Sequence, residues 1–192
     1  IAEERAAART TPAPVYSYAT HGKFRFANYK HPDYTSSIFL YENAFKELNN
    51  MLVGESKTDI KKAIYEIENI FYKGTLPYNK FTEAIQYLKH IVELIGKKYK
   101  LDLSKKVSLH FAIQKLYSDT IYDPLTKRNF YPFRYDFNDI YVEQSYDQGF
   151  VTKLLITGKG QCHSLPLLYK ILAEEFNITA YLSYSPNHSY IQ

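Results

Sequence analysis

Hydrophobic residues return every three or four positions between residues 36 and 122, which is the period of amphipathic helices. The first such stretch begins at Ser36 and ends at Gly54, with its apolar stripe at Leu40, Ala44, Phe45, Leu48 and Leu52. Three more stripes follow, at Ile60, Ile64, Ile67 and Phe71, at Phe81, Ile85, Leu88, Val92 and Ile95, and at Val107, Phe111, Leu116 and Tyr117.

Helices with one apolar face must bury that face against a neighbour. We therefore predict a small antiparallel helical bundle or subdomain over residues 36–122, preceded by an N-terminal extension over residues 1–35. A solenoid of helix pairs is the other arrangement that the helices allow. The spacing lacks the fixed residue signature of such repeats, which favours the bundle.

The pattern changes after residue 122. Residues 123–149 have no helical period and are rich in Tyr, Phe, Pro and Asp, so we expect an ordered aromatic loop there, either functional or a packing cover. The elements expected after it are a short helix, a longer helix, a strand of period two and, after a turn, a second strand: Phe150–Thr157, Cys162–Phe176, Ile178–Tyr184 and His188–Gln192. This order predicts an α+β fold.

Composition excludes several classes of protein. The chain has 192 residues, 45% hydrophobic and 23% charged, which is ordinary globular usage and unlike a disordered chain, a collagen or a coiled-coil rod. Its net charge of +4 is mild and its basic residues are scattered, so no nucleic-acid partner is expected. No apolar run approaches the roughly 18 residues of a membrane span, so we expect a soluble chain. The compartment and the oligomeric state are left open.

One short segment has the features of a reactive site. The only cysteine, Cys162, follows Gly158-Lys-Gly-Gln at the predicted start of an amphipathic helix. Free N–H groups at a helix N-terminus favour a thiolate, and glycine lets the backbone approach a substrate closely. Pro166 fits the first turn of that helix. A single cysteine also excludes an internal disulfide.

A nucleophilic cysteine needs a base, and His188 is the candidate. It lies 26 residues after Cys162, at the start of the last predicted strand. A helix packed on a two-stranded sheet can bring these two positions together. The alternative is a buried structural cysteine and an unrelated surface histidine.

The segment GKGQCHSLPLLYKILAEEFNITAYLSYSPNHSYI resembles the transglutaminase-like superfamily of papain-like cysteine enzymes. The resemblance lies in the order Gly-x-Cys at a helix start, apolar helix, strand, and His on the next strand. It implies a transglutaminase-like, papain-like core over residues 123–192, with Cys162 as nucleophile and His188 as base. The family's third residue, an Asp or Asn that orients the histidine, is expected beyond Gln192, in a core that this chain carries only in part. Carboxylates that could replace it are Asp136, Asp139 and Asp147.

The oxyanion of such an enzyme is bound by the backbone N–H of the cysteine and a side-chain donor upstream. The candidates for that donor are Gln161, Gln144, Tyr135 and Tyr146.

The resemblance implies a cysteine-dependent amide hydrolase, a protease or amidase of bacterial type, with a protein or peptide substrate and an acyl-enzyme intermediate. An amine acceptor in place of water would make it a crosslinking enzyme. The alternative is an inactive scaffold of the same fold that binds a protein partner. No cofactor is expected, and Cys162 with His163 and His188 is a poor zinc signature, so no metal is expected.

Overall fold

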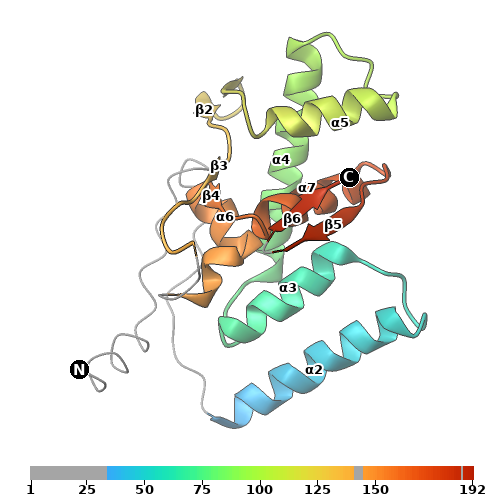
Figure 1. Cartoon of the computed structure of the whole chain (residues 1–192), viewed down its shortest axis with the longest axis vertical. Helices are drawn as coiled ribbons and strands as arrows, with labels where there is room; N and C mark the ends of the chain where they lie inside the picture. Colours follow the sequence, from blue (N-terminus) through green and yellow to red (C-terminus); the bar gives the residue numbers. More distant parts are fainter. Residues whose placement is uncertain (1–33, 141–144, 187) are drawn as a thin grey trace.

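The chain is described from a computed structural model over residues 34–140, 145–186 and 188–192 (Figure 1). The helices are α2 (Tyr34–Leu52), α3 (Ile60–Phe71), α4 (Tyr78–Lys98), α5 (Lys106–Lys115), α6 (Val151–Thr157), α7 (Ser164–Glu175) and the 3₁₀ turn η1 (Tyr146–Gly149). The strands are β1 (Ile121–Asp123), β2 (Arg128–Phe130), β3 (Arg134–Tyr135), β4 (Lys159–Gly160), β5 (Leu182–Ser185) and β6 (His188–Ile191). The mixture of helices and strands confirms the predicted α+β class. Residues 1–33 of the predicted N-terminal extension lie outside the described residues.

The long helix α4 runs through the middle of the structure (Figure 1). All five residues of its predicted stripe are fully buried: Phe81, Ile85, Leu88, Val92 and Ile95. It contacts α5, α7 and β1, so elements from both predicted parts of the chain pack on it. One hydrophobic cluster extends from Ile64 to Ala180, and the core is therefore continuous across residue 122.

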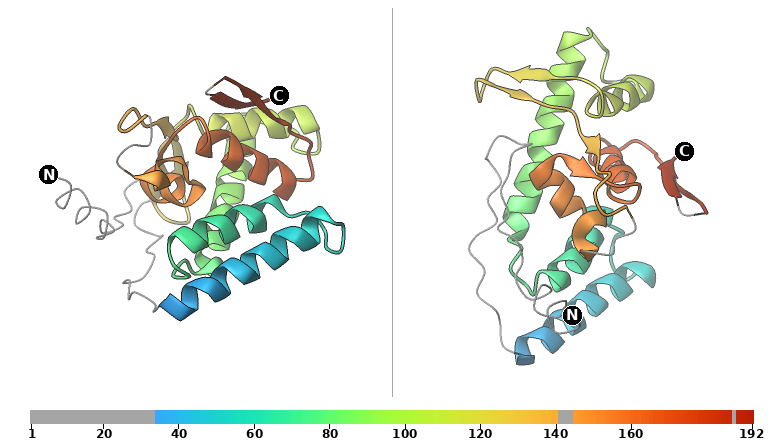
Figure 2. Two further views of the ribbon diagram at one scale, coloured as in Figure 1. Left: turned by 60° about the horizontal axis from the view of Figure 1, so that its bottom comes forward. Right: turned by 60° about the vertical axis from the view of Figure 1, so that its left-hand side comes forward.

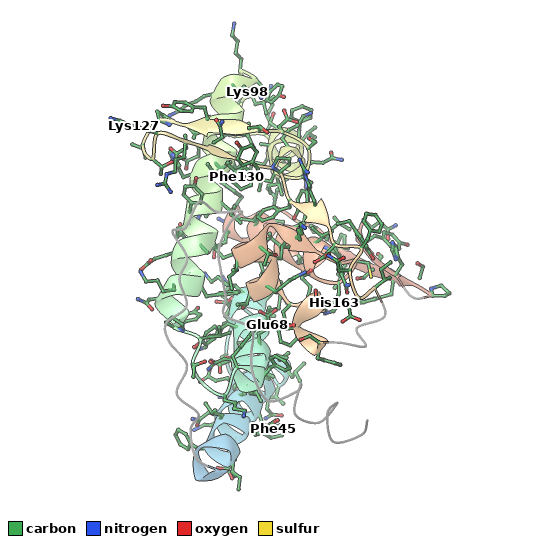
Figure 3. All side chains as sticks on the ribbon, turned by 90° about the vertical axis from the view of Figure 1, so that its left-hand side faces the viewer. Phe45, Glu68, Lys98, Lys127, Phe130 and His163 are labelled. Atoms are coloured by element: carbon green, nitrogen blue, oxygen red, sulfur yellow. The ribbon has the colours of Figure 1, made fainter. Side chains whose placement is uncertain are left out.

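Helices α2 and α3 run side by side as an outer layer (Figure 2, left). Ala44 of α2 is buried, but Phe45 is 70% and Leu52 is 86% exposed. The predicted apolar stripe of this helix is therefore wrong in part. The reason is that α2 packs closely on α3 alone among the described elements, so only one narrow face of it is covered. Figure 3 shows Phe45 at the outer end of the molecule.

The stripe predicted for α5 is also wrong in part. Val107 is 81% and Phe111 is 39% exposed, whereas the face toward α4 and α7 carries Leu109, Ala112, Ile113 and Leu116. These four residues have helical spacing of their own, so the helix exists as predicted but is rotated relative to the expected face.

The expected loop over residues 123–149 contains short strands that the sequence pattern did not reveal. The antiparallel hairpin β1–β2 turns at Asp123, whose buried carboxylate accepts hydrogen bonds from the Leu125 N–H at 3.0 Å and the Thr126 hydroxyl at 2.7 Å. Its Oδ1 also lies 3.1 Å from Nε2 of His90 in α4. Strands of three residues are too short for a period of two to be recognised.

Helix α7 contacts α3, α4, α5 and α6, and on another side the hairpin β5–β6. It begins two residues after Cys162, and β5 begins at Leu182 rather than at Ile178. Ile178 and Ala180 are buried in the core instead. At the end of the hairpin away from its turn, the backbones of Tyr181 and Gln192 form two hydrogen bonds. The Tyr181 N–H donates to the Gln192 carbonyl at 3.1 Å, and the Gln192 N–H donates to the Tyr181 carbonyl at 2.8 Å.

Candidate functional site

Cys162 lies in the turn between β4 and α7, where it is half-buried. The first turn of α7 is organised just beside it: Ser164 Oγ accepts the backbone N–H of Gln161 at 3.0 Å, and the Leu165 N–H donates to the Gln161 carbonyl at 3.1 Å. The cysteine therefore stands immediately before the helix, close to the N-terminal position that the sequence indicated.

Gly160 allows this turn to form. Strand β4 pairs in parallel with β3, and the Asp136 N–H donates to the Gly160 carbonyl at 2.7 Å. A Cβ on Gly160 would lie 2.6 Å from Ser164 Oγ and 3.0 Å from Leu154 Cδ1, so these side chains would have to shift to accommodate it. The backbone before Cys162 thus passes directly against the first turn of α7 because residue 160 is glycine.

Tyr135 is the oxyanion candidate that the structure brings to Cys162. In the β3–β4 pairing Tyr135 stands opposite Gly160, two residues before the cysteine. Its hydroxyl hydrogen-bonds with both the side chain and the backbone of Cys162. Burial, together with the neighbouring Cys162, raises the pKa of the Tyr135 hydroxyl, so it stays protonated and able to donate at neutral pH.

The other oxyanion candidates lie differently. The buried Gln161 amide donates through Nε2 to the carbonyls of Asp139 at 3.0 Å and Asn138 at 3.3 Å, so it ties down the loop after β3. To bind an oxyanion, it would first have to release those carbonyls. Tyr146 is 73% exposed and turns its ring edge to Phe150. Gln144 lies outside the described residues.

His188 is the first residue of β6 and is exposed. The next residue, Ser189, is buried, and its hydroxyl donates to the backbone carbonyl of Cys162. The structure therefore brings the beginning of β6 to the cysteine turn, across 26 residues of sequence. Catalytic pairing of the His188 imidazole with the thiol stays a prediction.

The three carboxylates considered as orienting groups have other contacts. Asp136 forms an ion pair with Lys153 of α6; burial alone would raise the Asp136 pKa, but the lysine and the N–H of Asn138 hold it below its usual value. Asp139 Oδ2 accepts the Ser145 N–H at 3.0 Å. Asp147 accepts from the Tyr72 hydroxyl at 3.2 Å. These contacts give each carboxylate a role in fixing a loop.

A buried carboxylate that the sequence reading missed supports the segment leading to Cys162. Glu68 of α3 is 3% exposed and accepts the N–H groups of Val151 at 2.7 Å and Thr152 at 2.8 Å, which begin α6 (Figure 3). Burial raises its pKa to about 7, against the opposing effect of these hydrogen bonds. The stripe predicted for α3 is wrong in part, since Ile67 is 52% and Phe71 is 43% exposed. Glu68 lies on the buried face instead, one helical turn after Ile64, and that spacing was its signal in the sequence.

His163 is the residue just before α7, where its side chain makes no capping hydrogen bond (Figure 3). It lies near Gly149, because a Cβ added to that glycine would be 3.9 Å from the His163 Cβ. Partial burial of its ring lowers the His163 pKa. Within the described parts of the chain, no three His, Cys, Asp or Glu side chains are grouped so as to hold a metal ion.

No family model, curated protein or solved structure matches this chain. Over the described ranges, no helix has both the length and the apolar character needed to cross a membrane.

Proposed function

We propose that this chain is a cysteine-dependent acyl-transfer enzyme of transglutaminase-like, papain-like type that hydrolyses an amide bond in a protein or peptide. Cys162 is its nucleophile, His188 its general base and Tyr135 its side-chain oxyanion donor. The observation that carries the proposal is the contact of the Tyr135 hydroxyl with both the side chain and the backbone of Cys162. A protonated hydroxyl beside a thiol at a helix start is the arrangement that acyl transfer needs.

In the first half-reaction His188 takes the thiol proton and the Cys162 sulfur attacks the amide carbonyl carbon. The oxyanion that forms is stabilised by the Cys162 N–H and the Tyr135 hydroxyl. The imidazolium of His188 then gives its proton to the nitrogen, the C–N bond breaks, and an amine leaves a thioester on Cys162.

In the second half-reaction His188 takes a proton from water, whose oxygen attacks the thioester carbonyl. The C–S bond breaks, the carboxylic acid leaves, and the Cys162 sulfur recovers a proton from His188. An amine in place of this water would yield a crosslinked product.

A second candidate is a non-catalytic scaffold that binds a protein partner. It is favoured by the exposed aromatic side chains near the cysteine turn, since Phe137 is 75% and Tyr184 is 68% exposed. Aromatic side chains at such positions are typical of protein interfaces.

The experiment that tests the proposal is the pH dependence of Cys162 alkylation by iodoacetamide in the wild type and in His188→Ala. Because the chain has one cysteine, the rate reports this thiol alone. His163→Ala is the matched control, since His163 adjoins Cys162 in sequence but has no role in the proposal. We expect alkylation near pH 7 to be fast in the wild type and in His163→Ala and much slower in His188→Ala, because the imidazole takes the thiol proton. An ordinary thiol in all three proteins would favour the scaffold.

A further inference from the structure

The backbone carbonyl of Cys162 accepts a hydrogen bond from a side chain that is distant in sequence. The hydroxyl of Ser189 in β6 donates to it, although the two residues are 27 positions apart in sequence. Ser189 is 7% exposed and is the only buried residue of β6, while His188 and Tyr190 on either side of it are exposed. The hydrogen bond therefore comes from the most deeply buried residue of the strand.

The sequence explains why this carbonyl needs a donor from outside the helix. In α-helical geometry each carbonyl accepts the N–H four residues later. The neighbours of Cys162 follow this rule, because the Leu165 N–H donates to the Gln161 carbonyl at 3.1 Å and the Leu167 N–H to the His163 carbonyl at 3.3 Å. The residue four positions after Cys162 is Pro166, which has no N–H.

We propose that Pro166 and Ser189 together form a latch: the proline keeps the Cys162 carbonyl open, and the serine hydroxyl binds it and so docks β6 on the cysteine turn. Ser189 is then a positioning residue, which holds the neighbouring His188 at the site. The role of His188 rests on the proposed function, whereas the docking of the strand does not.

The hairpin needs such an attachment. Its strands have four residues each, and a two-stranded hairpin of this length is marginally stable by itself. Ile191, on the same face of β6 as Ser189, packs on the hydrophobic core. Ile191 thus holds the far end of β6 and Ser189 the near end, which fixes the strand along α7.

The test compares Ser189→Ala with Ser183→Ala. Ser183 lies opposite Tyr190 in the same hairpin, and its hydroxyl donates to Oε1 of Gln192 at 2.9 Å. Amide hydrogen exchange is carried out on the whole folded protein and read from the proteolytic fragment that covers residues 181–192. We expect exchange to be about five- to tenfold faster in Ser189→Ala, because that variant loses about one buried hydrogen bond. We expect no change in Ser183→Ala.

A second pair of variants isolates the part played by the proline. Pro166→Ala supplies an N–H to the Cys162 carbonyl, so adding Ser189→Ala to it should accelerate exchange less than twofold. Wild-type exchange in Ser189→Ala, or an equal effect of that substitution in both backgrounds, would overturn the latch.

Iodoacetamide alkylation of Cys162 in the same proteins separates the latch from the enzyme. We expect the His188-dependent part of the alkylation pH profile to weaken in Ser189→Ala and to persist in Ser183→Ala. If wild-type alkylation does not depend on His188 while exchange responds as expected, the proposed function and the positioning of His188 fail, and the docking of β6 stands.

Discussion

The carboxylate of Glu68, in the buried face of α3, accepts the backbone N–H of Val151 at 2.7 Å, where α6 begins. This bond joins the predicted helical subdomain to the segment that runs through α6 and β4 to Cys162. Helix α6 ends at Gly158, whose φ of 69° is left-handed and turns the chain into β4. The position of the cysteine turn therefore depends on a residue almost 100 positions earlier.

The pH dependence of stability tests the burial of this carboxyl group. Burial raises the folded-state pKa of Glu68 from 4.5 to about 7, so folding favours the protonated acid. Its contribution to the free energy of unfolding is fully present below pH 4.5 and is lost as the pH rises through 7, by about 3 kcal/mol. We predict that Glu68→Gln removes this decline, measured by urea unfolding between pH 4 and 8. Glu66→Gln, whose carboxylate pairs with Lys62, is the control and should keep the wild-type slope. A wild-type slope in Glu68→Gln would refute the assignment.

The close approach at Gly160 predicts a second effect. Gly160→Ala places a Cβ 2.6 Å from Ser164 Oγ, so the hydroxyl that accepts the Gln161 N–H must shift. We expect a loss of about 1–3 kcal/mol in the free energy of unfolding. The matched control is Gly149→Ala. Its Cβ would lie an ordinary 3.9 Å from the His163 Cβ, so stability should change by less than about 0.5 kcal/mol. Equal stabilities of the two variants would contradict the geometry.

The ion pair of Lys153 with Asp136 holds α6 against the end of β3. The side chains are 12% and 7% exposed, so Lys153→Met leaves a buried carboxylate without its cation. We predict a loss of about 3 kcal/mol at pH 7, measured by urea unfolding.

The response of stability to acidification tests the same ion pair. In the wild type the lowered pKa of Asp136 supplies stability that is lost as the pH falls below the usual 3.8. In Lys153→Met burial still opposes the carboxylate, and only the Asn138 N–H and the charge of Lys159 still favour it. The variant should therefore lose less stability on acidification than the wild type. Lys170→Met, which breaks a surface pair with Glu174, should have little effect at either pH. Similar losses of unfolding free energy in both variants would show that the Lys153–Asp136 pair contributes no more than a surface ion pair.

Helix α4 was predictable because all five residues of its stripe are buried, so the period of the sequence is the period of the packing. The same reasoning failed in part for α2, where Phe45 belongs to the apolar pattern but is 70% exposed. A pattern shows which residues are apolar, and only the neighbouring elements decide which of them are covered.

Sequence also named the residues of the candidate site without separating them. Tyr135 and Tyr146 were equal candidates for the oxyanion donor. The parallel pairing of β3 with β4, in which each strand has two residues, distinguishes them because it places Tyr135 opposite Gly160. So short a pairing has no periodicity. Glu68, in contrast, was detectable as an acid one helical turn after Ile64.

The role of Tyr135 gives the sharpest test of the site chemistry. An oxyanion donor lowers the barrier only where a tetrahedral oxyanion forms. Acylation of Cys162 by p-nitrophenyl acetate passes through such an intermediate, whereas alkylation by iodoacetamide is a direct displacement without one. We predict that Tyr135→Phe slows acylation about 10²–10³-fold and changes alkylation much less. The lost contact with the thiol affects both reactions, whereas an oxyanion forms only in acylation.

Tyr146→Phe is the matched control, because that ring is 73% exposed and its hydroxyl should affect neither reaction. A merely structural role for Tyr135 would alter the surroundings of the thiol and change both rates together. Parallel changes in acylation and alkylation would therefore remove Tyr135 from the proposed mechanism. They would leave the backbone N–H of Cys162 as the remaining oxyanion donor.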